Sequence, residues 1–348
     1  MIIKTLNLFI ILILFSVLFK HQSAKNYSFS FKIFDKQLPE SIDSSFLEEQ
    51  IVTGNQVDCV HSVTACEIGK AKIRAFWYGG SREGAKDVAI YTSVFDPINK
   101  KWSKNIPIVT PKLTQNLLYR YIKKIGNPVI FKKQNGDLIL FFVSVSFGGW
   151  AGSSINIIIS SDDGETWSSP KRLISTPFFN ISTLVKSIPF FYDDGTIGLP
   201  VYHEFIGKFC ELLRINENGD VLYKKRLSKG DYSLSPVIIP LDSKTAVCFL
   251  RNHGPKYRNI LYMKTDNGGY SWTKPVINQL PNHNSAFSCI RLQNNNLLMA
   301  LNYSKKRRDN LAIALSKDSG ISWKVLYYFE KEKSIMGGFK WEFAYPWV

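Results

Sequence analysis

The sequence predicts an all-β protein, a six-bladed β-propeller, and three observations support this fold class. A pattern of the form S-x-D-x-G-x-[ST]-W occurs at residues 160–167 and 316–323, and residues 265–272 repeat it with Asn267 in the Asp position. Short runs rich in β-branched and aromatic residues lie between these copies and are typical of strands. No amphipathic helix pattern follows the N-terminal segment. Self-similarity at intervals indicates a repeat architecture.

Each copy of the pattern is expected to form a hairpin turn. The Asp or Asn side chain accepts hydrogen bonds from N–H groups of the turn, and Gly takes the position with positive φ. The Ser and Thr hydroxyls tie the ends together, while Trp packs as a large apolar side chain. The pattern is therefore structural, and function has to be argued from other residues.

The spacing of the copies gives the number of blades. Trp167 and Trp272 are 105 residues apart, whereas Trp272 and Trp323 are 51 apart. The longer interval is expected to contain a degenerate copy, at residues 216–220, and residues 96–102 resemble another. Units of about fifty residues with four strands are propeller blades. The five turns mark five blades, and the flanking segments are expected to supply a sixth.

The sixth blade is expected to be incomplete or closed by the N-terminal segment. The chain ends 25 residues after Trp323, and strands from both ends of a propeller commonly share one blade. Residues 28–34 would then provide much of the last blade. We expect either this arrangement or a truncated reading frame.

The first 24 residues are expected to be a signal peptide or a membrane anchor, and residues 25–348 the propeller domain. Residues 1–19 are largely apolar and begin with a basic residue, Lys4, as secretory signals do. The run almost reaches the length that spans a bilayer, so an uncleaved anchor stays open. In both cases we expect the propeller to be exported, as a secreted, periplasmic or membrane-anchored protein.

The composition favours an anionic sugar or acidic glycan as the partner, rather than a nucleic acid. The chain has 348 residues and a formal net charge of +16. Its Lys and Arg residues are scattered rather than gathered with aromatic residues, so we expect no nucleic-acid partner. A general positive field attracts anionic sugars and acidic glycans. The five cysteines have no metal-site spacing, and no metal or other cofactor is expected.

The densest group of candidate site residues lies in residues 76–91. A strand ends at Gly80, a polar loop presents Arg82, Glu83 and Asp87, and a second strand follows. Charged residues on a tight loop between buried strands favour a site, although a solvated hairpin tip with an Arg–Glu pair is the alternative.

With this loop and the repeated turns, the chain resembles the sialidase (neuraminidase) superfamily of Asp-box propellers, in particular the bacterial predicted neuraminidases. The resemblance covers roughly residue 55 to the end. It implies an exo-acting glycoside hydrolase that releases terminal sialic acid or a related anionic sugar from glycans. It also implies that the Asp boxes lie away from the catalytic face.

The resemblance further implies roles for particular residues. Sialidases bind the substrate carboxylate with arginines and use a Tyr as nucleophile. Arg251 resembles the second arginine of the family, and Arg308, with Arg307 as its rival, the third. Tyr345 stands where the nucleophile would follow the last Asp box.

The general acid is expected in the loop of residues 76–91. Asp87 is the choice by analogy and Glu83 the choice from its exposure on the loop. Both, together with Arg82, are expected near the central channel and within reach of Arg251.

Two departures from the family pattern keep an alternative open. His61 stands where the first arginine is expected, so that Arg82 would have to supply the missing guanidinium. No Glu precedes Arg251 at the spacing of the Tyr partner, and Glu204 is the nearest substitute. The chain could thus act on another sugar or by another mechanism, with His61, His203 and Glu204 in the site.

Further polar residues are expected to ring the channel. The starts of inner strands carry Asn127, the His203–Glu204 pair and residues 281–285, which would bind substrate there. His203 and Glu204 would point to opposite faces of a regular strand. Two other classes of function stay open: a non-catalytic propeller that binds glycan or protein, and a lyase or hydrolase that acts on another anionic sugar.

Overall fold

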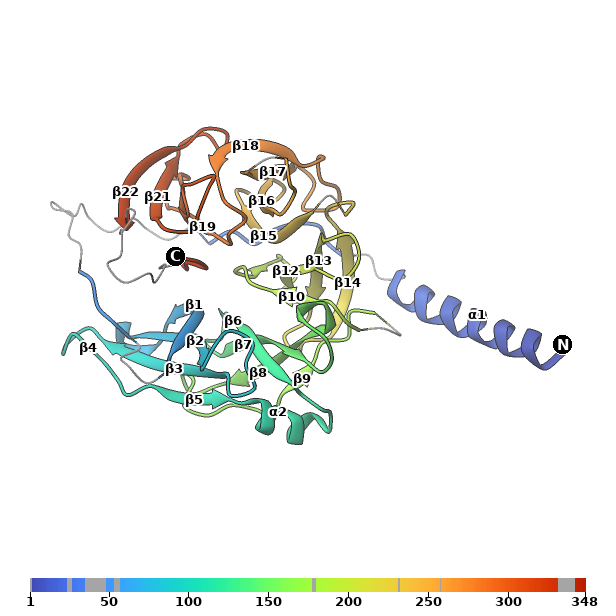
Figure 1. Ribbon diagram of the computed structural model, residues 1–348. Helices are drawn as coiled ribbons and strands as arrows, with labels where there is room; N and C mark the ends of the chain where they lie inside the picture. Colours follow the sequence, from blue (N-terminus) through green and yellow to red (C-terminus); the bar gives the residue numbers. More distant parts are fainter. Residues whose placement is uncertain are drawn as a thin grey trace.

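The strands of the protein form a ring of five antiparallel sheets in the part of the chain that the computed structural model describes (Figure 1). The described residues are 2–23, 27–34, 48–52, 57–176, 180–230, 232–256, 258–330 and 342–348. The predicted all-β propeller is therefore confirmed. The predicted sixth blade is wrong, because the described strands make five blades.

The blades follow one another along the chain. Blade 1 holds β1 (Cys59–Glu67), β2 (Ile73–Gly80), β3 (Ala89–Asp96), β4 (Lys101–Trp102) and β5 (Ile106–Val109), and blade 2 holds β6 (Lys124–Lys132), β7 (Leu138–Val145), β8 (Ser153–Ser160) and β9 (Lys171–Arg172). Blade 3 holds β10 (Leu184–Val185), β11 (Phe190–Phe191), β12 (Ile197–His203), β13 (Phe209–Ile215) and β14 (Val221–Arg226). Blade 4 holds β15 (Ser233–Pro240), β16 (Ala246–Asn252), β17 (Asn259–Thr265) and β18 (Val276–Pro281), and blade 5 holds β19 (Ser288–Arg291), β20 (Leu297–Leu301), β21 (Leu311–Ser316) and β22 (Lys324–Glu330).

The described part of the chain also contains two α-helices and two short 3₁₀ turns. They are α1 (Ile2–Ser23), α2 (Pro111–Leu118) and the short 3₁₀ turns η1 (Gly69–Ala71) and η2 (Trp150–Gly152). Figure 1 shows α1 projecting away from the blades. Within the described ranges, none of the helices has the length and apolarity needed to cross a membrane.

Apolar strand sequences are buried because the blades pack face to face, and blades 2, 3 and 4 each lie between two neighbours. In β7 the adjacent residues Phe141 and Phe142 are both 0% exposed. Since successive side chains of a strand point to opposite faces, both faces of this blade are covered. Three apolar clusters fill the interfaces: one between blades 1 and 2, one among blades 2, 3 and 4, and one between blades 4 and 5.

All five predicted turns join the third main strand of a blade to the next strand, as the spacing required. In blade 2, Asp162 accepts hydrogen bonds from the N–H of Thr166 at 2.9 Å and from its hydroxyl at 2.6 Å. These bonds lower the pKa of Asp162 to about 2. In blade 4, Asn267 accepts from the N–H of Ser271 and donates to its hydroxyl oxygen. The Asn variant therefore keeps the turn.

The Trp of each Asp box packs against the preceding blade. Trp167 meets Phe76 edge to face with ring centroids 5.8 Å apart, and Trp323 meets Phe249 at 5.6 Å. Gly320 has φ +85°, and a Cβ atom there would lie 2.4 Å from Phe249. This turn therefore requires Gly both for its backbone conformation and for the close approach of the ring.

The described N-terminal residues 27–34 lie against blades 3 and 4, so their predicted place in the last blade is wrong. Phe31 forms a bridge with Tyr192 of blade 3, and its N–H donates to the carbonyl of Ser243 in blade 4. Arg214 of blade 3 donates to the carbonyl of Ser28 at 2.7 Å. Aromatic and cationic contacts with blade 3 thus decided where this segment packs.

The described C-terminal residues 342–348 connect blade 5 to blade 1. The indole N–H of Trp347 donates to the carbonyl of Ala65 in β1 at 2.9 Å, and the N–H of Val348 donates to the hydroxyl of Ser288 in β19 at 3.3 Å. Figure 1 shows this end of the chain near the middle of the ring. The described coil residues 342–348 therefore bridge the two blades.

Candidate functional site

Each blade has one residue in the left-handed region, either near the beginning of its innermost strand or just before it. These residues have φ between 46° and 61° and are Ser62, Asn127, Ser182, Ser235 and Asn284. In β1, β6 and β15 the residue coincides with a shift of strand register, which is the mark of a β-bulge. Bulges redirect side chains and are common beside active sites. The repeat therefore builds a ring of irregular backbone at one end of the channel.

Tyr345 lies at this end, held by contacts from blades 1, 4 and 5. Arg251 donates from Nη1 to the Tyr345 hydroxyl oxygen at 3.1 Å. The ring of His61 lies 4.4 Å from the Tyr345 ring, centroid to centroid. The N–H of Phe343 donates to the carbonyl of Arg308. Tyr345 itself has φ +61°, an uncommon conformation for an aromatic residue and one concentrated at functional sites.

Asn284 connects the two predicted arginines. Its side-chain oxygen accepts from Arg251 Nε at 2.8 Å, and its carbonyl accepts from Arg308 Nη2 at 2.7 Å. Arg308 also pairs with Glu342 at 3.6 Å. His253 Nδ1 lies 3.2 Å from the same Asn284 side-chain oxygen, and Lys208 Nζ lies 2.8 Å from its other ring nitrogen. Asn284 thus fixes both guanidinium groups, and that of Arg251 contacts the Tyr345 phenol.

His61 is held in the neutral form near neutral pH. Burial lowers its pKa most, and the charges of Lys186 and Arg308 lower it further, while Glu83 and Glu342 oppose this. The imidazole can therefore accept a proton. It does not replace the arginine expected at this place as a fixed charge.

The loop after β2 places its three charged residues differently. Glu83 accepts a hydrogen bond from the Tyr78 hydroxyl at 3.3 Å, which points it toward His61, since Tyr78 also meets the His61 ring. Asp87 accepts from the N–H of Ser81 at 2.8 Å and from its hydroxyl at 2.9 Å. These bonds hold the pKa of Asp87 below its ordinary value. Asp87 therefore closes the loop, while Glu83 faces the site.

Arg82 is exposed on the same loop, and its charge acts on Asp87. Among the described residues its side chain makes no hydrogen bond or ion pair. The sequence predicts Arg82 within reach of Arg251, but the structure shows no contact between these two side chains among the described residues.

Asn127 and Glu204 lie toward the channel, whereas His203 turns away from it. Asn127 donates to the Tyr202 hydroxyl oxygen at 3.3 Å. His203 Nε2 lies 2.7 Å from a carboxylate oxygen of Glu211 on the neighbouring strand, within blade 3. Burial raises the pKa of Tyr202 strongly, and the charges of Tyr345 and Glu204 add to this effect. Because it pairs with Glu211 inside blade 3, His203 does not contribute to the site.

The strand register brings three of the site residues to equivalent places. Tyr78 and Arg251 both lie opposite the residue that precedes the left-handed one, in blades 1 and 4. Glu204 has this place in blade 3, two residues beyond Tyr202. One position of the repeat thus contributes a phenol, a guanidinium and a carboxylate.

Two site residues were not singled out from the sequence. Asn284, within the polar residues 281–285, was visible only as part of a strand start, although it orients both arginines. Lys186 is 1% exposed and lies under Tyr345, with its Nζ 5.7 Å from the ring centroid. Its one sequence signal is a lysine that directly follows the apolar pair of β10.

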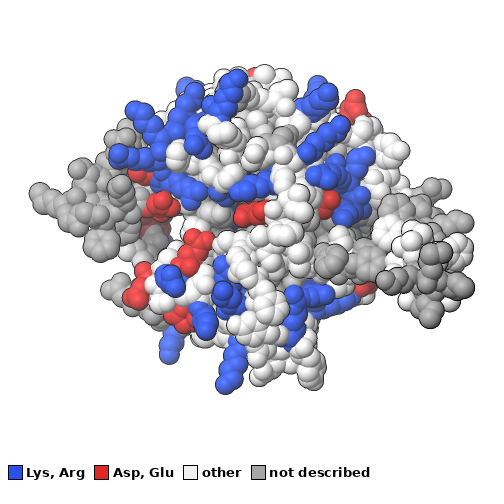
Figure 2. Space-filling model, turned by 45° about the vertical axis from the view of Figure 1, so that its right-hand side comes forward, with Lys and Arg blue, Asp and Glu red and all other residues white. Residues whose placement is uncertain are grey.

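Positive charge is widespread on one face of the molecule (Figure 2). Figure 2 shows Lys and Arg side chains gathered over the upper half of the face it presents, with Asp and Glu side chains more sparsely placed. In the ranges that the structure describes, no group of three His, Cys, Asp or Glu side chains is arranged to hold a metal, and the five cysteines form no disulfide bond there. The site therefore offers the side-chain chemistry of arginine, tyrosine, histidine and carboxylate.

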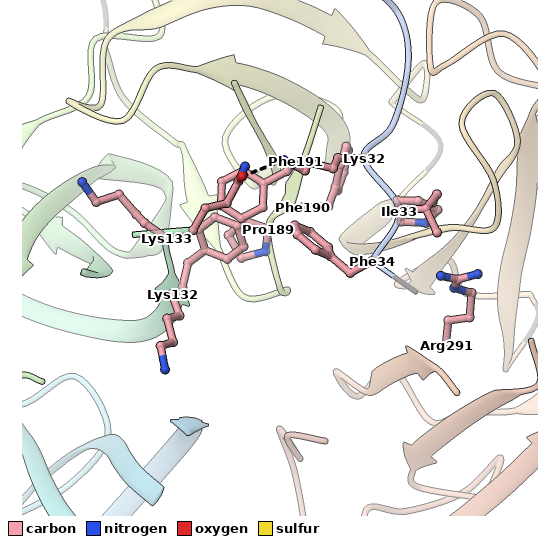
Figure 3. Close-up of a pocket in the computed structure, with 12 residues that line it drawn as sticks. Lys32, Ile33, Phe34, Lys132, Lys133, Pro189, Phe190, Phe191 and Arg291 are labelled. Atoms are coloured by element: carbon pink, nitrogen blue, oxygen red, sulfur yellow. Dashed lines mark hydrogen bonds between the residues drawn. The ribbon is translucent and has the colours of Figure 1, made fainter. Parts of the chain in front are cut away.

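A hollow of about 490 Å³ lies at the opposite end of the inner strands (Figure 3). It adjoins Lys132 at the end of β6, whereas Asn127 lies near the beginning of that strand. Lys132 and Lys133 extend away from its phenyl rings, and Lys133 pairs with Asp137 at 2.8 Å. This hollow therefore lacks the converging polar groups of the site around Tyr345.

Comparison with known proteins agrees with this arrangement. A family model described as a BNR repeat-like domain matches residues 71–348. The chain belongs to the BNR repeat-like family. Among curated proteins, none matches the sequence of this BNR repeat-like protein.

Solved sialidases share the fold of this BNR repeat-like protein. A Hadza microbial sialidase is 14% identical with a TM-score of 0.66, and the match covers 79% of this chain and 60% of the sialidase chain. The NanB sialidase from Streptococcus pneumoniae is 13% identical with a TM-score of 0.63, covering 86% and 64%. The intramolecular trans-sialidase from Ruminococcus gnavus is 10% identical with a TM-score of 0.61, covering 81% and 88%.

The BNR repeat-like protein thus spans 60% and 64% of the length of the first two sialidases. At these identities the likeness establishes the fold. The predicted resemblance to the sialidase superfamily is confirmed at the level of family and fold, and the predicted-neuraminidase subgroup stays a prediction.

Proposed function

We propose that this protein is a glycoside hydrolase that removes a terminal anionic sugar from glycans, with sialic acid as the first candidate. The hydrogen bond of 3.1 Å between Arg251 and Tyr345 carries this proposal. In sialic acid the carboxylate is attached to the anomeric carbon itself. A guanidinium and a phenol in contact can therefore bind the carboxylate and attack the neighbouring carbon at the same time.

The reaction proceeds in two steps. Tyr345 Oη forms a bond to the anomeric carbon while the bond to the leaving oxygen breaks, and Glu83 protonates that oxygen. His61, kept neutral by burial, accepts the phenol proton. Water then attacks the anomeric carbon, gives its proton to Glu83 and releases Tyr345 Oη, which regains its proton from His61.

A neutral phenol suits this substrate better than a carboxylate nucleophile does. A second carboxylate close to an anionic sugar would repel it, whereas Arg251 and Arg308 neutralise the substrate charge. Glu83 is assigned as the acid instead of Asp87, because the Asp87 carboxylate is engaged by Ser81 in the loop.

The test is release of 4-methylumbelliferone from its α-N-acetylneuraminide by the purified protein, with the β-glucuronide and the β-galactoside as comparison substrates. The proposal expects turnover of the neuraminide and none of the neutral galactoside. Turnover of the glucuronide alone would keep an anionic substrate but overturn sialic acid. Binding of sialyllactose with no hydrolysis of any substrate would instead identify a non-catalytic glycan-binding propeller.

We also propose that the protein is exported, on the basis of the apolar N-terminal residues 1–19. N-terminal sequencing and fractionation of cells that express the full chain test this. A protein found in the cytoplasm with residue 1 intact would overturn the proposal.

A further inference from the structure

Lys186 is a buried cation beneath the site that the reaction above does not use. It directly follows β10 in blade 3 and is 1% exposed. Its Nζ lies 5.7 Å from the ring centroid of Tyr345 and 5.3 Å from that of Trp347. Both contacts are cation–π interactions, which hold an ammonium without neutralising its charge.

No carboxylate compensates this ammonium in the part of the chain that the structure describes. Lys186 has no ion pair there, and burial lowers its pKa to about 7. The titratable groups that face it are His61 of β1, whose pKa its charge lowers, and Tyr345 of the C-terminal segment. An unpaired buried charge is costly to a folded protein. An anion bound close to Lys186 would compensate this charge.

The propeller fold does not require a lysine here. Lys186 is the fourth residue after the left-handed residue of its blade, Ser182. The corresponding residues of blades 1, 2 and 4 are Cys66, Phe131 and Ile239, all without charge. A neutral side chain therefore serves the same place in the ring. The cost of the buried charge in blade 3 has to have a reason outside the packing of the blades.

We propose that Lys186 is the counter-charge for an anionic sugar in the site and takes up a proton as the sugar's carboxylate binds beside Arg251 and Tyr345. The inference rests on the proposed function only for the class of ligand. Lys186 acts across the Tyr345 ring, whose hydroxyl contacts Arg251. Because Lys186 is buried and Tyr345 is half-buried, solvent screens the attraction only in part. An arriving carboxylate stabilises the protonated amine and so raises its pKa.

Titration calorimetry tests this proposal directly. N-acetylneuraminic acid, its methyl ester and galacturonic acid are titrated into the protein at pH 7.5, in phosphate and in Tris, whose ionisation enthalpies differ. The two acids are expected to take up between about half a proton and one proton per molecule bound, and the neutral ester none. In Lys186→Met the uptake should disappear and the acids should bind about tenfold more weakly.

The control is Lys171→Met, which removes an exposed lysine paired with Asp220 on the outer strand β9. It should keep both affinity and proton uptake. Uptake that persists in Lys186→Met would assign the proton to His61 and overturn the inference, even if hydrolysis is observed. Uptake without hydrolysis would support the inference and overturn the hydrolase. If neither acid binds to the wild-type protein or to the Lys171→Met variant, both the inference and the proposed function are overturned.

Discussion

Arg251 and Tyr345 form a hydrogen bond of 3.1 Å although 94 residues separate them in the chain. Arg251 belongs to β16 of blade 4, while Tyr345 lies on the segment that connects blade 5 to blade 1. The ring of His61, in blade 1, also packs against the ring of Tyr345. The site therefore depends on closure of the ring, and a change that frees the C-terminal segment should abolish activity while the five blades remain folded.

Tyr345→Phe removes the phenol oxygen and keeps the ring against His61 and Lys186. We expect turnover at saturating substrate to fall by at least about 10³-fold, as removal of a covalent nucleophile does. The measurement is the rate of release of the aryl group from the neuraminide, with circular dichroism to check the fold. Tyr327→Phe, on exposed strand β22, is the matched control. Full activity of the Tyr345 variant would favour the alternative based on His61 and Glu204.

Arg251→Lys keeps a positive charge but loses the fork that reaches both Asn284 and Tyr345. The KM is expected to rise about 10- to 100-fold, because charge-assisted hydrogen bonds are lost. Arg226→Lys, which changes an arginine stacked on Phe209, should leave KM unchanged. An unchanged KM with a lowered kcat would mean that Arg251 acts only in the transition state.

Glu83→Gln and Asp87→Asn separate the two candidate acids. The Glu83 variant is expected to lose roughly 10²- to 10⁴-fold in rate on a glycan whose leaving oxygen needs a proton, and less on an aryl glycoside. The Asp87 variant should lose thermal stability, because the carboxylate ties the loop to Ser81, with equal effects on both substrates. If the dependence on leaving group follows Asp87 instead, the assignment of the acid is reversed.

The sequence predicted the turns and the blades well because their chemistry is local. Asp162 and Asn267 bond to groups four residues away, so a short pattern contains the whole turn. Ring closure depends on the contact of Trp347 with Ala65, which are 282 residues apart. No local pattern carries such a contact, so the sequence did not predict how blades 5 and 1 are connected.

The site was predicted in part. The resemblance to sialidases pointed to Arg251, Arg308 and Tyr345, which the structure brings close to one another. Asn284 connects them through strand register, which a short polar run does not reveal. Lys186 was missed for a different reason: lysines are almost always exposed, whereas this one is buried and contacts the rings of Tyr345 and Trp347, which lie far away in the sequence.

Gly320→Ala tests the turn chemistry of the blades. Gly320 has φ +85°, and the added Cβ would meet Phe249 at 2.4 Å, whereas Gly195, with φ +80°, has open space at that position. Gly195→Ala should cost about 1–2 kcal/mol of unfolding free energy from the backbone alone. Gly320→Ala should cost about 1–3 kcal/mol more from overpacking. Urea unfolding of both variants measures this difference, and equal losses would contradict the close approach.

Lys186→Met is expected to stabilise the protein by an amount that depends on pH. Burial lowers the pKa of Lys186 to about 7 from its ordinary 10.5. Between these values the unfolded chain binds more protons than the folded one, so the stability of the wild-type protein rises with pH across this window. The cost of the buried charge is complete below about pH 7 and vanishes above about pH 10.5.

The gain from Met should therefore be largest near pH 7 and below, on the order of several kcal/mol, and should shrink steadily toward pH 10. Urea unfolding at pH 6, 7.5 and 9 measures it. Lys171→Met is the matched control, since its half-exposed ammonium pairs with Asp220 and should show little dependence on pH. Because an uncharged side chain of similar length removes the penalty and keeps the packing, a loss of stability at every pH would mean that the ammonium is compensated. Lys186 would then not need an anionic ligand to compensate its charge.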